Sequence, residues 1–366
     1  MQITLKREEL LKPLSLVAGV VERRQTLPIL SNVLMRLTGD ELRLSGTDME
    51  VEIVVEVGGV NGSDGEITLP ARKLLDICRA LPADAKIELR IEKQKATIKS
   101  GRSRFSLVTM PAVDYPVIEA GGWERSLQVP QKRLRRLLEK TQFCMAQQDV
   151  RYYLNGLLIE VEDKRLRGVA TDGHRMALSD CTLEDRAPDG KQVIVPRKGV
   201  HELLRLLDDS DGAAELRFGV NHLQLQLPGI QFTTKLIDGR FPEYSKVIPN
   251  NQSVTLSLQR DELREILSRA AILSNEKYRG VRLSIAPGIL RVSAHNPEQE
   301  EAQEELPISY EGTELEIGFN VNYIIDAIGA IAGDIVELGL TDANSSCTLM
   351  SPDDRDSQYV IMPMRL

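Results

Sequence analysis

The sequence is poor in the residues that build metal sites and disulfide frameworks. It holds only four cysteines and four histidines in 366 residues. They stand far apart, with no CxxC, CxxH or HExxH spacing, so neither a zinc site nor a disulfide network is expected. The spacing instead predicts reduced, mostly buried thiols in a cytoplasmic protein that needs no metal and no cofactor. The cysteines are Cys78, Cys144, Cys181 and Cys347.

Long apolar runs and an export signal are also missing. The apolar runs fall far short of the roughly 20 residues that a membrane helix needs. The N-terminal stretch MQITLKREELLKPL lacks the basic-then-apolar plan of a signal peptide. We therefore expect a globular protein that makes no contact with a membrane. The net charge of −8 argues on average against nucleic-acid binding, although a single basic face could still attract DNA.

The sequence also lacks a GxSxG nucleophile elbow and a glycine-rich phosphate loop. One stretch, VATDGHRMALSD at 169–180, nevertheless gathers Asp172, His174 and Arg175 beside a glycine. It could be an active site. It could also be the polar end of a strand, where Asp172 makes an Asx-type turn.

An internal repeat helps to choose between these two interpretations. Residues 27–48, 152–172 and 278–296 each read as an apolar strand, a polar turn and a second strand. Each segment ends in a pair of polar residues. The pair in one segment lies 124 residues after the pair in the segment before it (171 − 47 and 295 − 171). The pairs are Thr47–Asp48, Thr171–Asp172 and His295–Asn296. Asp172 thus stands at a recurring position whereas His174 does not, which favours the strand end.

Each repeat also contains two segments with the 3.6-residue period of a helix, and many hairpin-joined strands. This pattern predicts an α+β fold of three repeated domains, each with two helices backed by antiparallel sheets. Polar stretches at 119–126 and 249–253 place the domains at 1–122, 123–250 and 251–366. The repeats alone are compatible with a closed assembly or with an open arc.

Basic residues recur in five of the six predicted helices. The helix near 131–140 is the most basic, with only Glu139 opposing five cations, which are Lys132, Arg133, Arg135, Arg136 and Lys140. Solvated helix faces would explain any one of these helices. A shared basic surface, which would contact phosphates without reading base sequence, explains the recurrence better.

Opposite charges gather at opposite ends of the array. Residues 93–105 hold five bases and no acid, whereas residues 298–316 hold eight acids and no base. Such ends favour head-to-tail association, which makes a ring when the rotation closes. We expect the interface to include apolar neighbours of both patches. Its predicted residues are Lys73, Arg102, Arg104, Phe105 and Leu107 at one end, and Ile272, Leu273, Glu298, Glu300 and Glu304 at the other.

Several strings, in chain order from the first residues to the last, resemble one family. They include TLPIL, SGRSRFSL, QDVRYYLNG, VATDGHR, VIVPRKGV, DGRFP, AAILSNEKYRGVRL, EIGFNV and the terminal YVIMPMRL. The sequence resembles the bacterial sliding clamps, the beta subunits of DNA polymerase III. The resemblance implies a DNA clamp fold: a head-to-tail homodimer forming a six-domain ring, with helices around a central hole. Such a ring has no catalytic activity. It encircles duplex DNA without sequence preference and tethers the polymerase for processive synthesis.

The resemblance also implies site residues and partners. DNA contacts would be Arg24, Gln148, Tyr152, Tyr153, Arg197 and Lys198. A pocket between the second and third domains would accept a short linear peptide that ends in hydrophobic residues. Its carriers would be the replicative polymerase alpha subunit, the clamp loader delta subunit, translesion and repair polymerases, mismatch repair proteins and ligase. The matching pocket positions are Leu154, Thr171, Gly173, His174, Arg175, Met176, Pro242, Lys246, Val247, Asn320, Tyr323, Asn344, Ser346, Val360, Ile361, Met362, Pro363, Met364 and Arg365.

Three positions depart from the family pattern. Lys246 stands where many relatives carry arginine, Asn344 where an apolar residue is usual, and Tyr278 where phenylalanine is common. Lysine lacks the planar fork of arginine, so the preference among peptides is expected to differ. Two other function classes stay open: an enzyme that uses Asp172, His174 and Arg175, and an open scaffold that binds only proteins. The clamp interpretation places the protein in the cytoplasm, associated with the nucleoid.

Overall fold

The structure is a computed structural model that describes residues 1–22, 27–119, 121–249 and 251–365. The chain forms two compact units. The first unit contains Met1–Lys132 and His201–Leu236, and the second contains Arg133–Val200 and Ile237–Leu366. The division passes through the central repeat, so the compact units do not coincide with the three predicted domains. The limits at 122 and 250 stay predictions.

The first unit is built mainly of antiparallel strands with two helices of its own. Its helices are α1 (Arg7–Val20) and α2 (Ala71–Ala80). Its strands are β1 (Gln2–Lys6), β2 (Asn32–Thr38), β3 (Glu41–Thr47), β4 (Val51–Val57), β5 (Asn61–Ser63), β6 (Gly65–Pro70), β7 (Lys86–Glu92), β8 (Lys95–Ser100), β9 (Ser103–Val108), β10 (Arg125–Pro130), β13 (Ala213–Phe218), β14 (His222–Leu227) and β15 (Ile230–Lys235).

The second unit is likewise built mainly of antiparallel strands with two helices of its own. Its helices are α5 (Arg260–Ala271) and α6 (Val321–Ala330), while α3 (Gln131–Thr141) and α4 (Arg197–Leu206) cross the division between the units. Its strands are β11 (Gly156–Thr171), β12 (Arg175–Pro196), β16 (Val254–Gln259), β17 (Gly280–Ala286), β18 (Ile289–His295), β19 (Glu301–Pro307), β20 (Leu315–Asn320), β21 (Ile335–Leu340), β22 (Cys347–Ser351) and β23 (Asp354–Ile361). The described residues thus contain the six predicted helices.

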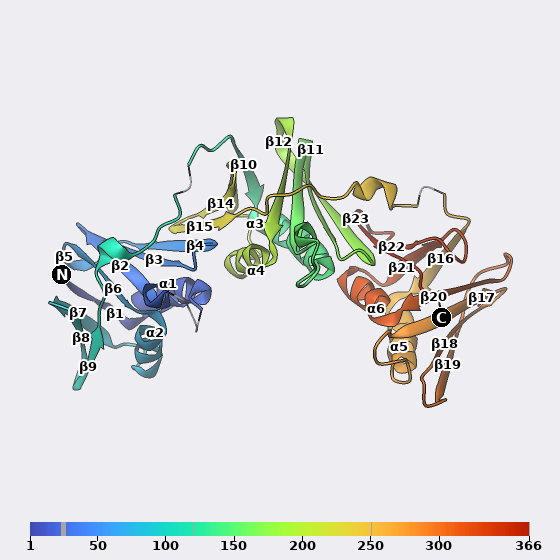
Figure 1. The fold of residues 1–366 in the computed structure, drawn as a ribbon, viewed down its shortest axis with the longest axis horizontal. Coiled ribbons are helices and arrows are strands. Elements are labelled where there is room, and N and C mark those ends of the chain that lie inside the picture. The colour runs from blue at the N-terminus through green and yellow to red at the C-terminus, as the bar shows by residue number, and fades with distance from the viewer. Residues whose placement is uncertain (23–26, 120, 250, 366) are drawn as a thin grey trace. The chain divides into compact units, whose positions relative to one another are not determined.

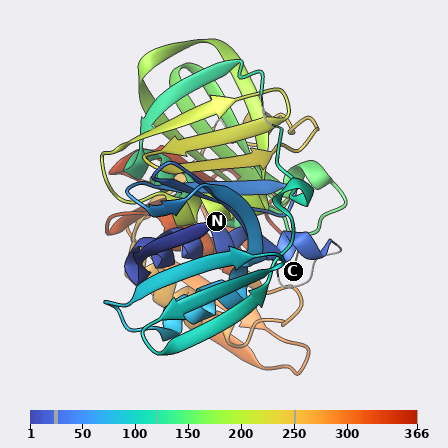
Figure 2. The ribbon, with the colours of Figure 1, turned by 90° about the vertical axis from the view of Figure 1, so that its left-hand side faces the viewer.

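The sheets join neighbouring repeats. In the first unit, an eight-stranded sheet runs β10-β13-β14-β15-β4-β3-β2-β6, and a five-stranded sheet runs β5-β1-β7-β8-β9. Strand β15 of the central repeat pairs with β4 of the first repeat, with Thr233 opposite Glu52. Figure 2 shows this junction, where the yellow strands lie beside the blue ones. Helices α1 and α2 lie side by side in the same unit (Figure 1) and bury apolar residues such as Leu10, Leu14 and Leu74.

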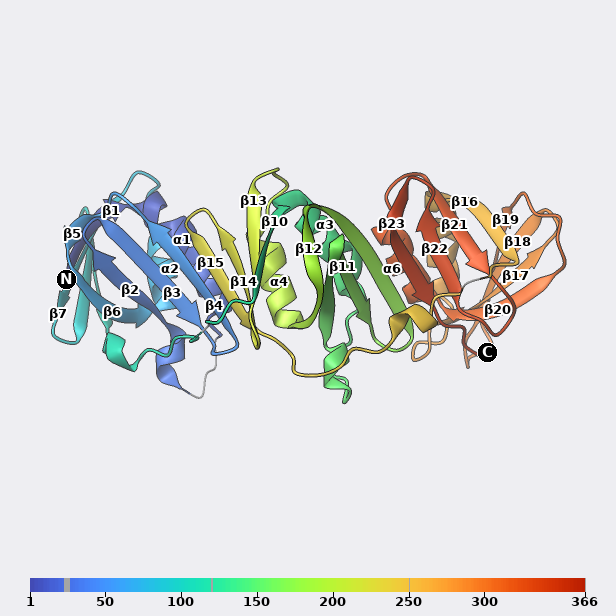
Figure 3. The same cartoon turned by 90° about the horizontal axis from the view of Figure 1, so that it is seen from above.

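The second unit repeats this arrangement between the central and third repeats. A six-stranded sheet runs β11-β12-β23-β22-β21-β16, and a four-stranded sheet runs β19-β18-β17-β20. Strand β12 pairs with β23, with Met176 opposite Val360. Strands β21, β22 and β23 run side by side in Figure 3. Parts of the chain that are separated by 184 residues, as Met176 and Val360 are, therefore meet in one sheet.

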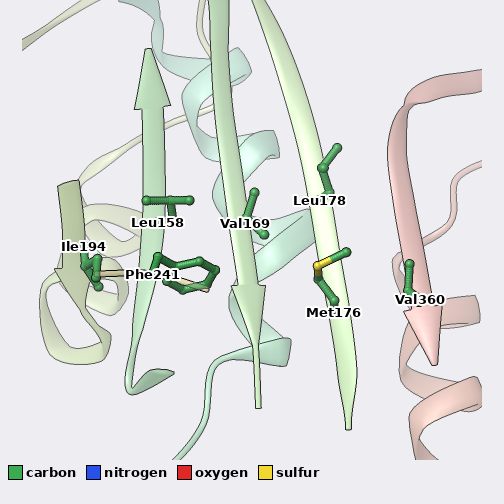
Figure 4. Close-up of a cluster of buried hydrophobic side chains, with 7 residues drawn as sticks. All are labelled: Leu158, Val169, Met176, Leu178, Ile194, Phe241 and Val360. Atoms are coloured by element: carbon green, nitrogen blue, oxygen red, sulfur yellow. The ribbon is translucent and has the colours of Figure 1, made fainter. Parts of the chain in front are cut away.

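The strand–turn–strand pattern of the repeats is confirmed. The turn between β2 and β3 has Gly39 at φ 63°, and the turn between β17 and β18 has Gly288 at φ 78°. In the central repeat the turn falls inside β11, where Asp163 has φ 50° and the register shifts. Figure 4 shows the Leu158 and Val169 stretches of β11 running in opposite directions. These positions need a left-handed backbone, which glycine and aspartate tolerate best.

The four cysteines are free and buried, as predicted. Burial raises the pKa of the Cys78 thiol to about 11 and that of Cys347 to about 12, so both are protonated at neutral pH. In the described part of the chain, no group of histidine, cysteine and acidic side chains is placed to hold a metal ion. Among the same residues, no helix is long and apolar enough to cross a membrane.

Candidate partner-binding site

The site begins at the turn between β11 and β12. Thr171 donates its hydroxyl to the carbonyl of Arg175 at 2.7 Å, and accepts from the Gly173 nitrogen at 3.1 Å. The Asp172 carboxylate accepts from the backbone nitrogens of His174 at 2.9 Å and Arg175 at 3.0 Å. Gly173 takes φ 89°, a conformation that most side chains disfavour. The sequence TDG therefore closes this turn by itself, which is the Asx-type turn predicted for Asp172.

Arg175 ties this turn to the third repeat. Its side chain is only 13% exposed and reaches Asp172 at 3.1 Å and Asp326 of α6 at 2.6 Å. A third nitrogen donates to the carbonyl of Phe143 at 3.0 Å. The guanidinium carbon also lies 4.4 Å from the ring centre of Tyr323. A planar, multiply bonded cation of this kind fixes the position of α6 relative to the turn.

A cavity of about 230 Å³ opens beside the turn. Nine of the nineteen pocket positions implied by the resemblance line it. They are Leu154, Thr171, Gly173, Arg175, Met176, Pro242, Val247, Val360 and Met362. They come from η4 (Tyr152–Leu154), from β11, β12 and the turn between them, from β23 and the residue after it, and from the chain that follows β15. Segments far apart in sequence therefore build one apolar hollow.

The floor of the cavity is a buried apolar cluster. Its residues come from β11, β12, β23 and the segment after β15, and Figure 4 shows them gathered across these strands. They are Leu158, Val169, Met176, Leu178, Ile194, Phe241 and Val360. Met176 and Val360 belong to both the cluster and the cavity wall, so the wall is supported from behind. Methionine can repack around different apolar groups, which suits a site that accepts more than one partner.

Three further residues line the cavity. Arg151, Tyr153 and Tyr244 were not assigned to the pocket from sequence, and Tyr153 was predicted to contact DNA. Arg151 forms a fork with Asp149, at 3.0 and 2.8 Å, and donates to the Asp172 carbonyl at 3.2 Å. Arg151 belongs to the string QDVRYYLNG, which also contains the predicted pocket residue Leu154. This neighbourhood in the sequence was a signal that Arg151 lines the pocket.

Tyr244 is held by a polar network behind the cavity wall. Arg167 donates two hydrogen bonds of 2.6 Å to the Asp180 carboxylate and a third, of 3.3 Å, to the Tyr244 hydroxyl. That hydroxyl donates to Glu160 at 3.2 Å. Burial, more than any other cause, raises the pKa of Tyr244, so the phenol stays neutral. The network fixes the short helical turn η5 (Tyr244–Lys246) that carries this wall.

The other ten implied pocket positions do not line this cavity. His174 and Tyr323 stack on each other with ring centres 6.4 Å apart, beside Arg175. Asn320 caps α6 by accepting from the Asn322 nitrogen at 3.0 Å. Lys246 pairs with Glu243 and is exposed. Ile361 is buried, and Met364 and Arg365 line a separate cavity. The last three are Asn344, Ser346 and Pro363, which lie outside the walls of both cavities.

Those residues predicted to contact DNA that the structure describes come from two segments. Arg24 lies outside the described residues. Tyr152 is 57% exposed and packs edge-on against Tyr153, at 5.8 Å between ring centres. Gln148 is exposed in a left-handed conformation, φ 56°. Arg197, at the start of α4, donates to the Met145 carbonyl at 3.1 Å. Its neighbour Lys198 is half-buried.

The basic helix α3 makes more internal contacts than its sequence suggests. Arg136 pairs with the buried Asp354 of β23 at 2.8 Å, and Lys140 lies 3.6 Å from the same carboxylate. Lys140 also donates to the carbonyl of Ala330, at the end of α6. The other cations contact an acid or a carbonyl close by: Lys132 with Asp211, Arg133 with the Thr182 carbonyl, and Arg135 with Glu139. Part of this charge therefore joins α3 to the third repeat.

Four of the five predicted interface residues of the first repeat lie on or next to the edge strand β9. Arg104 is exposed on that strand, whereas Arg102 stands in the turn before it and not on the strand. Phe105 is half-buried. Leu107, predicted as a contact, is only 9% exposed, because alternate residues of β9 face the core. Lys73 is exposed on α2.

At the acidic end, Ile272 is 74% exposed directly after α5, and Leu273 is half-buried. Glu298 and Glu300 are exposed in the loop between β18 and β19. The Glu300 carboxylate accepts from the side-chain amide of Asn296 at 2.6 Å. Arg269 binds the carboxylate of Glu304 at 2.8 and 2.9 Å. The hydrogen bonds from Arg269 lower the pKa of Glu304. This acid already has a partner within the chain.

Known proteins match the chain along its whole length. Models of the DNA polymerase III beta subunit match with the N-terminal domain at 1–119, the central domain at 128–243 and the C-terminal domain at 245–365. Over the full length of both chains, the beta sliding clamps of Pseudomonas aeruginosa and Vibrio cholerae are 53% and 49% identical to this chain. The crystal structure of the DNA polymerase III subunit beta from Pseudomonas aeruginosa is 52% identical, with a TM-score of 0.98 over the whole of both chains.

Proposed function

Because the chain belongs to the family of DNA polymerase III beta subunits, the beta sliding clamps, we propose that it forms a homodimeric ring around duplex DNA. The ring tethers the replicative polymerase so that synthesis is processive. The clamps of this family are processivity factors without catalytic activity. The enzyme hypothesis for Asp172, His174 and Arg175 is therefore abandoned, in agreement with the structural role of Asp172 in its turn.

The single observation that supports a docking role best is the apolar cavity beside the β11–β12 turn. Its walls come from both the central and the third repeats, and the cations Arg151 and Arg175 are among its lining residues. This combination fits an extended peptide that ends in hydrophobic residues and carries a polar or acidic group near them. The peptide would come from the polymerase alpha subunit, the loader delta subunit, repair and translesion polymerases, mismatch repair proteins or ligase.

DNA would be held by topology more than by tight contacts. The net charge of −8 disfavours strong binding to DNA, while the basic residues of α3 and α4 offer weak phosphate contacts. Gln148, Tyr152, Tyr153, Arg197 and Lys198 would contribute contacts that do not depend on base sequence, and so would Arg24. Weak contacts of this kind permit sliding. The protein would act in the cytoplasm at the nucleoid, with its domains at 1–122, 123–250 and 251–366.

Retention on circular DNA tests the ring. The protein is placed on a circular plasmid by a clamp loader and washed at high salt, which removes binding by charge alone. We expect it to stay on the circle and to leave when the plasmid is cut once. Loss from the intact circle would instead favour the open scaffold that binds only proteins.

A further inference from the structure

The partner pocket, as we call the cavity beside the β11–β12 turn, has an equivalent place in the first repeat. The repeat interval of 124 residues leads from Thr171 back to Thr47 and from Leu154 back to Leu30. Each threonine closes its turn in the same way, by donating its hydroxyl to a carbonyl four residues ahead. We call the place around the β3–β4 turn the first-repeat counterpart.

The first-repeat counterpart also has an apolar base. Its buried cluster consists of Ile29, Leu34 and Tyr115. Leu34 precedes Leu158, in the floor of the partner pocket, by 124 residues. Tyr115 stands before a proline, as Phe241 of that floor does. The turn and the base are therefore shared, and a difference in docking has to come from the wall.

Strand pairing shows which residues form the wall in each repeat. In the partner pocket, Met176 of β12 lies opposite Val360 of β23, and both line the cavity. In the first repeat, Glu52 of β4 lies opposite Thr233 of β15. Glu52 precedes Met176 by the same 124 residues as the turn threonines. Glu52 and Thr233 thus take the places of two apolar residues of the partner pocket.

A third wall position follows from the backbone hydrogen bonds next to these pairs. The nitrogen of Met362 donates at 2.9 Å to the carbonyl two residues before Met176. The nitrogen of Lys235 donates at 2.8 Å to the carbonyl two residues before Glu52. Lys235 therefore takes the place of Met362, which lines the partner pocket.

These three differences put an acid, a hydroxyl and an amine where the partner pocket is apolar. Glu52 is 6% exposed and Thr233 is 1% exposed, whereas Lys235 is exposed at the surface. The Glu52 carboxyl accepts a hydrogen bond from the backbone of Ile118 and interacts with the charge of Arg43. An apolar side chain that docked here would remove water from charged groups without offering them a hydrogen bond, which is unfavourable.

The turn itself differs in one side chain. Met49 stands where the partner pocket has Gly173, and both residues have a positive φ, 75° and 89°. Gly173 lines the cavity with its backbone alone, whereas Met49 adds a side chain that is 42% exposed. Glycine adopts such a backbone without strain, so Met49→Gly is compatible with the turn.

We infer that Glu52, Thr233 and Lys235 exclude the hydrophobic end of a partner peptide from the first-repeat counterpart, so that each chain docks one peptide and not two. The inference rests on the proposed function of the partner pocket. A protein selects one of two similar sites by making the other unfavourable, here through polar groups that an apolar ligand leaves unpaired. The three residues therefore determine the place of docking although they do not touch the docked peptide.

Stoichiometry on the full-length protein tests the inference. The probe is a synthetic peptide that ends in Leu-Phe, and isothermal titration calorimetry counts the bound peptides. The quadruple variant carries the partner-pocket residue at each differing position: Met49→Gly, Glu52→Met, Thr233→Val and Lys235→Met. We expect one peptide per chain on the unaltered protein and two per chain on the quadruple variant. A folded quadruple variant that still binds one peptide per chain overturns the inference.

Val247→Asp separates this inference from the proposed function. Val247 lines the partner pocket, so the single variant should bind the peptide at least about tenfold more weakly than the unaltered protein. Added to the quadruple variant, Val247→Asp should leave one peptide per chain, bound at the first-repeat counterpart. Undiminished binding to the single variant contradicts the proposed pocket, whereas a lack of binding to the combined variant overturns the inference.

The same apolar side chains placed elsewhere serve as the control. Glu66→Met, Thr38→Val and Lys86→Met introduce them at exposed positions of the first unit. This variant should bind one peptide per chain. A second peptide bound to it would show that added apolar surface of any kind creates a site, which overturns the inference.

The reciprocal exchange tests the same wall position without a gained site. Met176→Glu should weaken the peptide at least about tenfold at pH 8, where the introduced carboxyl is ionised. Part of this loss should be recovered at pH 5, because burial favours the neutral carboxyl. Thr255→Glu, exposed on β16 of the same unit, is the control and should bind like the unaltered protein at both pH values. Undiminished binding to Met176→Glu at pH 8 overturns the inference.

Covalent capture locates the second peptide. A photoreactive residue replaces the phenylalanine at the end of the peptide, and the adducts on the quadruple variant are mapped by mass spectrometry. Adducts on residues 27–30, 47–52 or 116–118, in addition to those in the partner pocket, support the inference. Adducts confined to the partner pocket contradict it.

Discussion

Asp48 and Asp172 stand 124 residues apart, and each accepts hydrogen bonds from the backbone nitrogens two and three residues after it. Asp48 accepts from Glu50 at 2.9 Å and Val51 at 2.8 Å, as Asp172 accepts from the two corresponding residues of its own turn. The threonines before them also match, because each donates to a carbonyl four residues ahead. The shared network is structural. What distinguishes the central repeat is the side chains it presents beyond the turn, His174 and Arg175.

Replacing these two residues separately should give different results. His174→Ala removes a ring that stacks on Tyr323, so it should weaken partner peptides with little loss of stability. Arg175→Ala leaves the largely buried Asp172 and the nearby Asp326 without their cation. It should weaken the peptides and also lower the free energy of unfolding by about 1–3 kcal/mol. Anisotropy and denaturant titration measure the two effects. Equal stability of both variants would contradict the role given to Arg175.

Glu52 should make the stability of the first unit depend on pH. Burial raises the pKa of Glu52 to about 7, against a backbone hydrogen bond at Ile118 and the charge of Arg43. Between about pH 4.5 and 7, the Glu52 carboxyl is therefore mostly protonated in the folded protein and mostly ionised in the unfolded chain. Stability from this group is present at low pH and is lost as the pH rises through about 7.

Glu52→Gln tests that dependence. Glutamine stays neutral, so the variant should be more stable than the unaltered protein at pH 8. The difference should shrink as the pH falls through 7 towards 5. Thermal unfolding followed across this range measures it, and Glu50→Gln, exposed two residues away, is the control. A constant difference at all pH values would show that the carboxyl does not titrate in this window.

Asp354 should stabilise the join between α3 and the third repeat. Burial by itself would raise the pKa of Asp354, but the bond from Arg136 and the charges of Arg136 and Lys140 lower it overall. Its contribution is therefore present above the unfolded carboxyl pKa of about 3.9 and is lost as the pH falls through the lower folded value. Asp354→Asn should cost about 1–3 kcal/mol at pH 7 and much less near pH 2. Asp353→Asn, exposed next to it, should cost little.

The repeat, the six helices and the α+β class follow from the sequence because period and turn residues are local signals. The Asx-type turn at Asp172 was predicted from a local signal of the same kind. The partners of α3 were not predictable, because Asp354 lies more than 200 residues from Arg136 and only the β12–β23 pairing brings them together. Arg151 and Tyr244 were missed from the pocket for a similar reason. Arg151 and Tyr244 lie in a loop and in a 3₁₀ turn, which have no periodic pattern, so only the string QDVRYYLNG offered a signal, and it offered one for Arg151 alone.

Reversing charge at the edge of β9 should convert dimers to monomers. Arg102 and Arg104 are exposed, and in the head-to-tail arrangement they would face Glu298 and Glu300 of a second copy. We expect the double variant Arg102→Glu, Arg104→Glu to sediment as a monomer because like charges then meet. Lys86→Glu, an exposed charge reversal on β7 of the same sheet, should leave the dimer intact.

A compensating change sharpens this experiment. Adding Glu298→Arg and Glu300→Arg to the double variant restores opposite charges across the proposed contact, so the dimer should return. Sedimentation velocity at low salt, where exposed charges are least screened, gives the clearest contrast. A dimer that persists through the first reversal would place the interface elsewhere. A monomer that the compensating change fails to rescue would show that these four residues do not face one another.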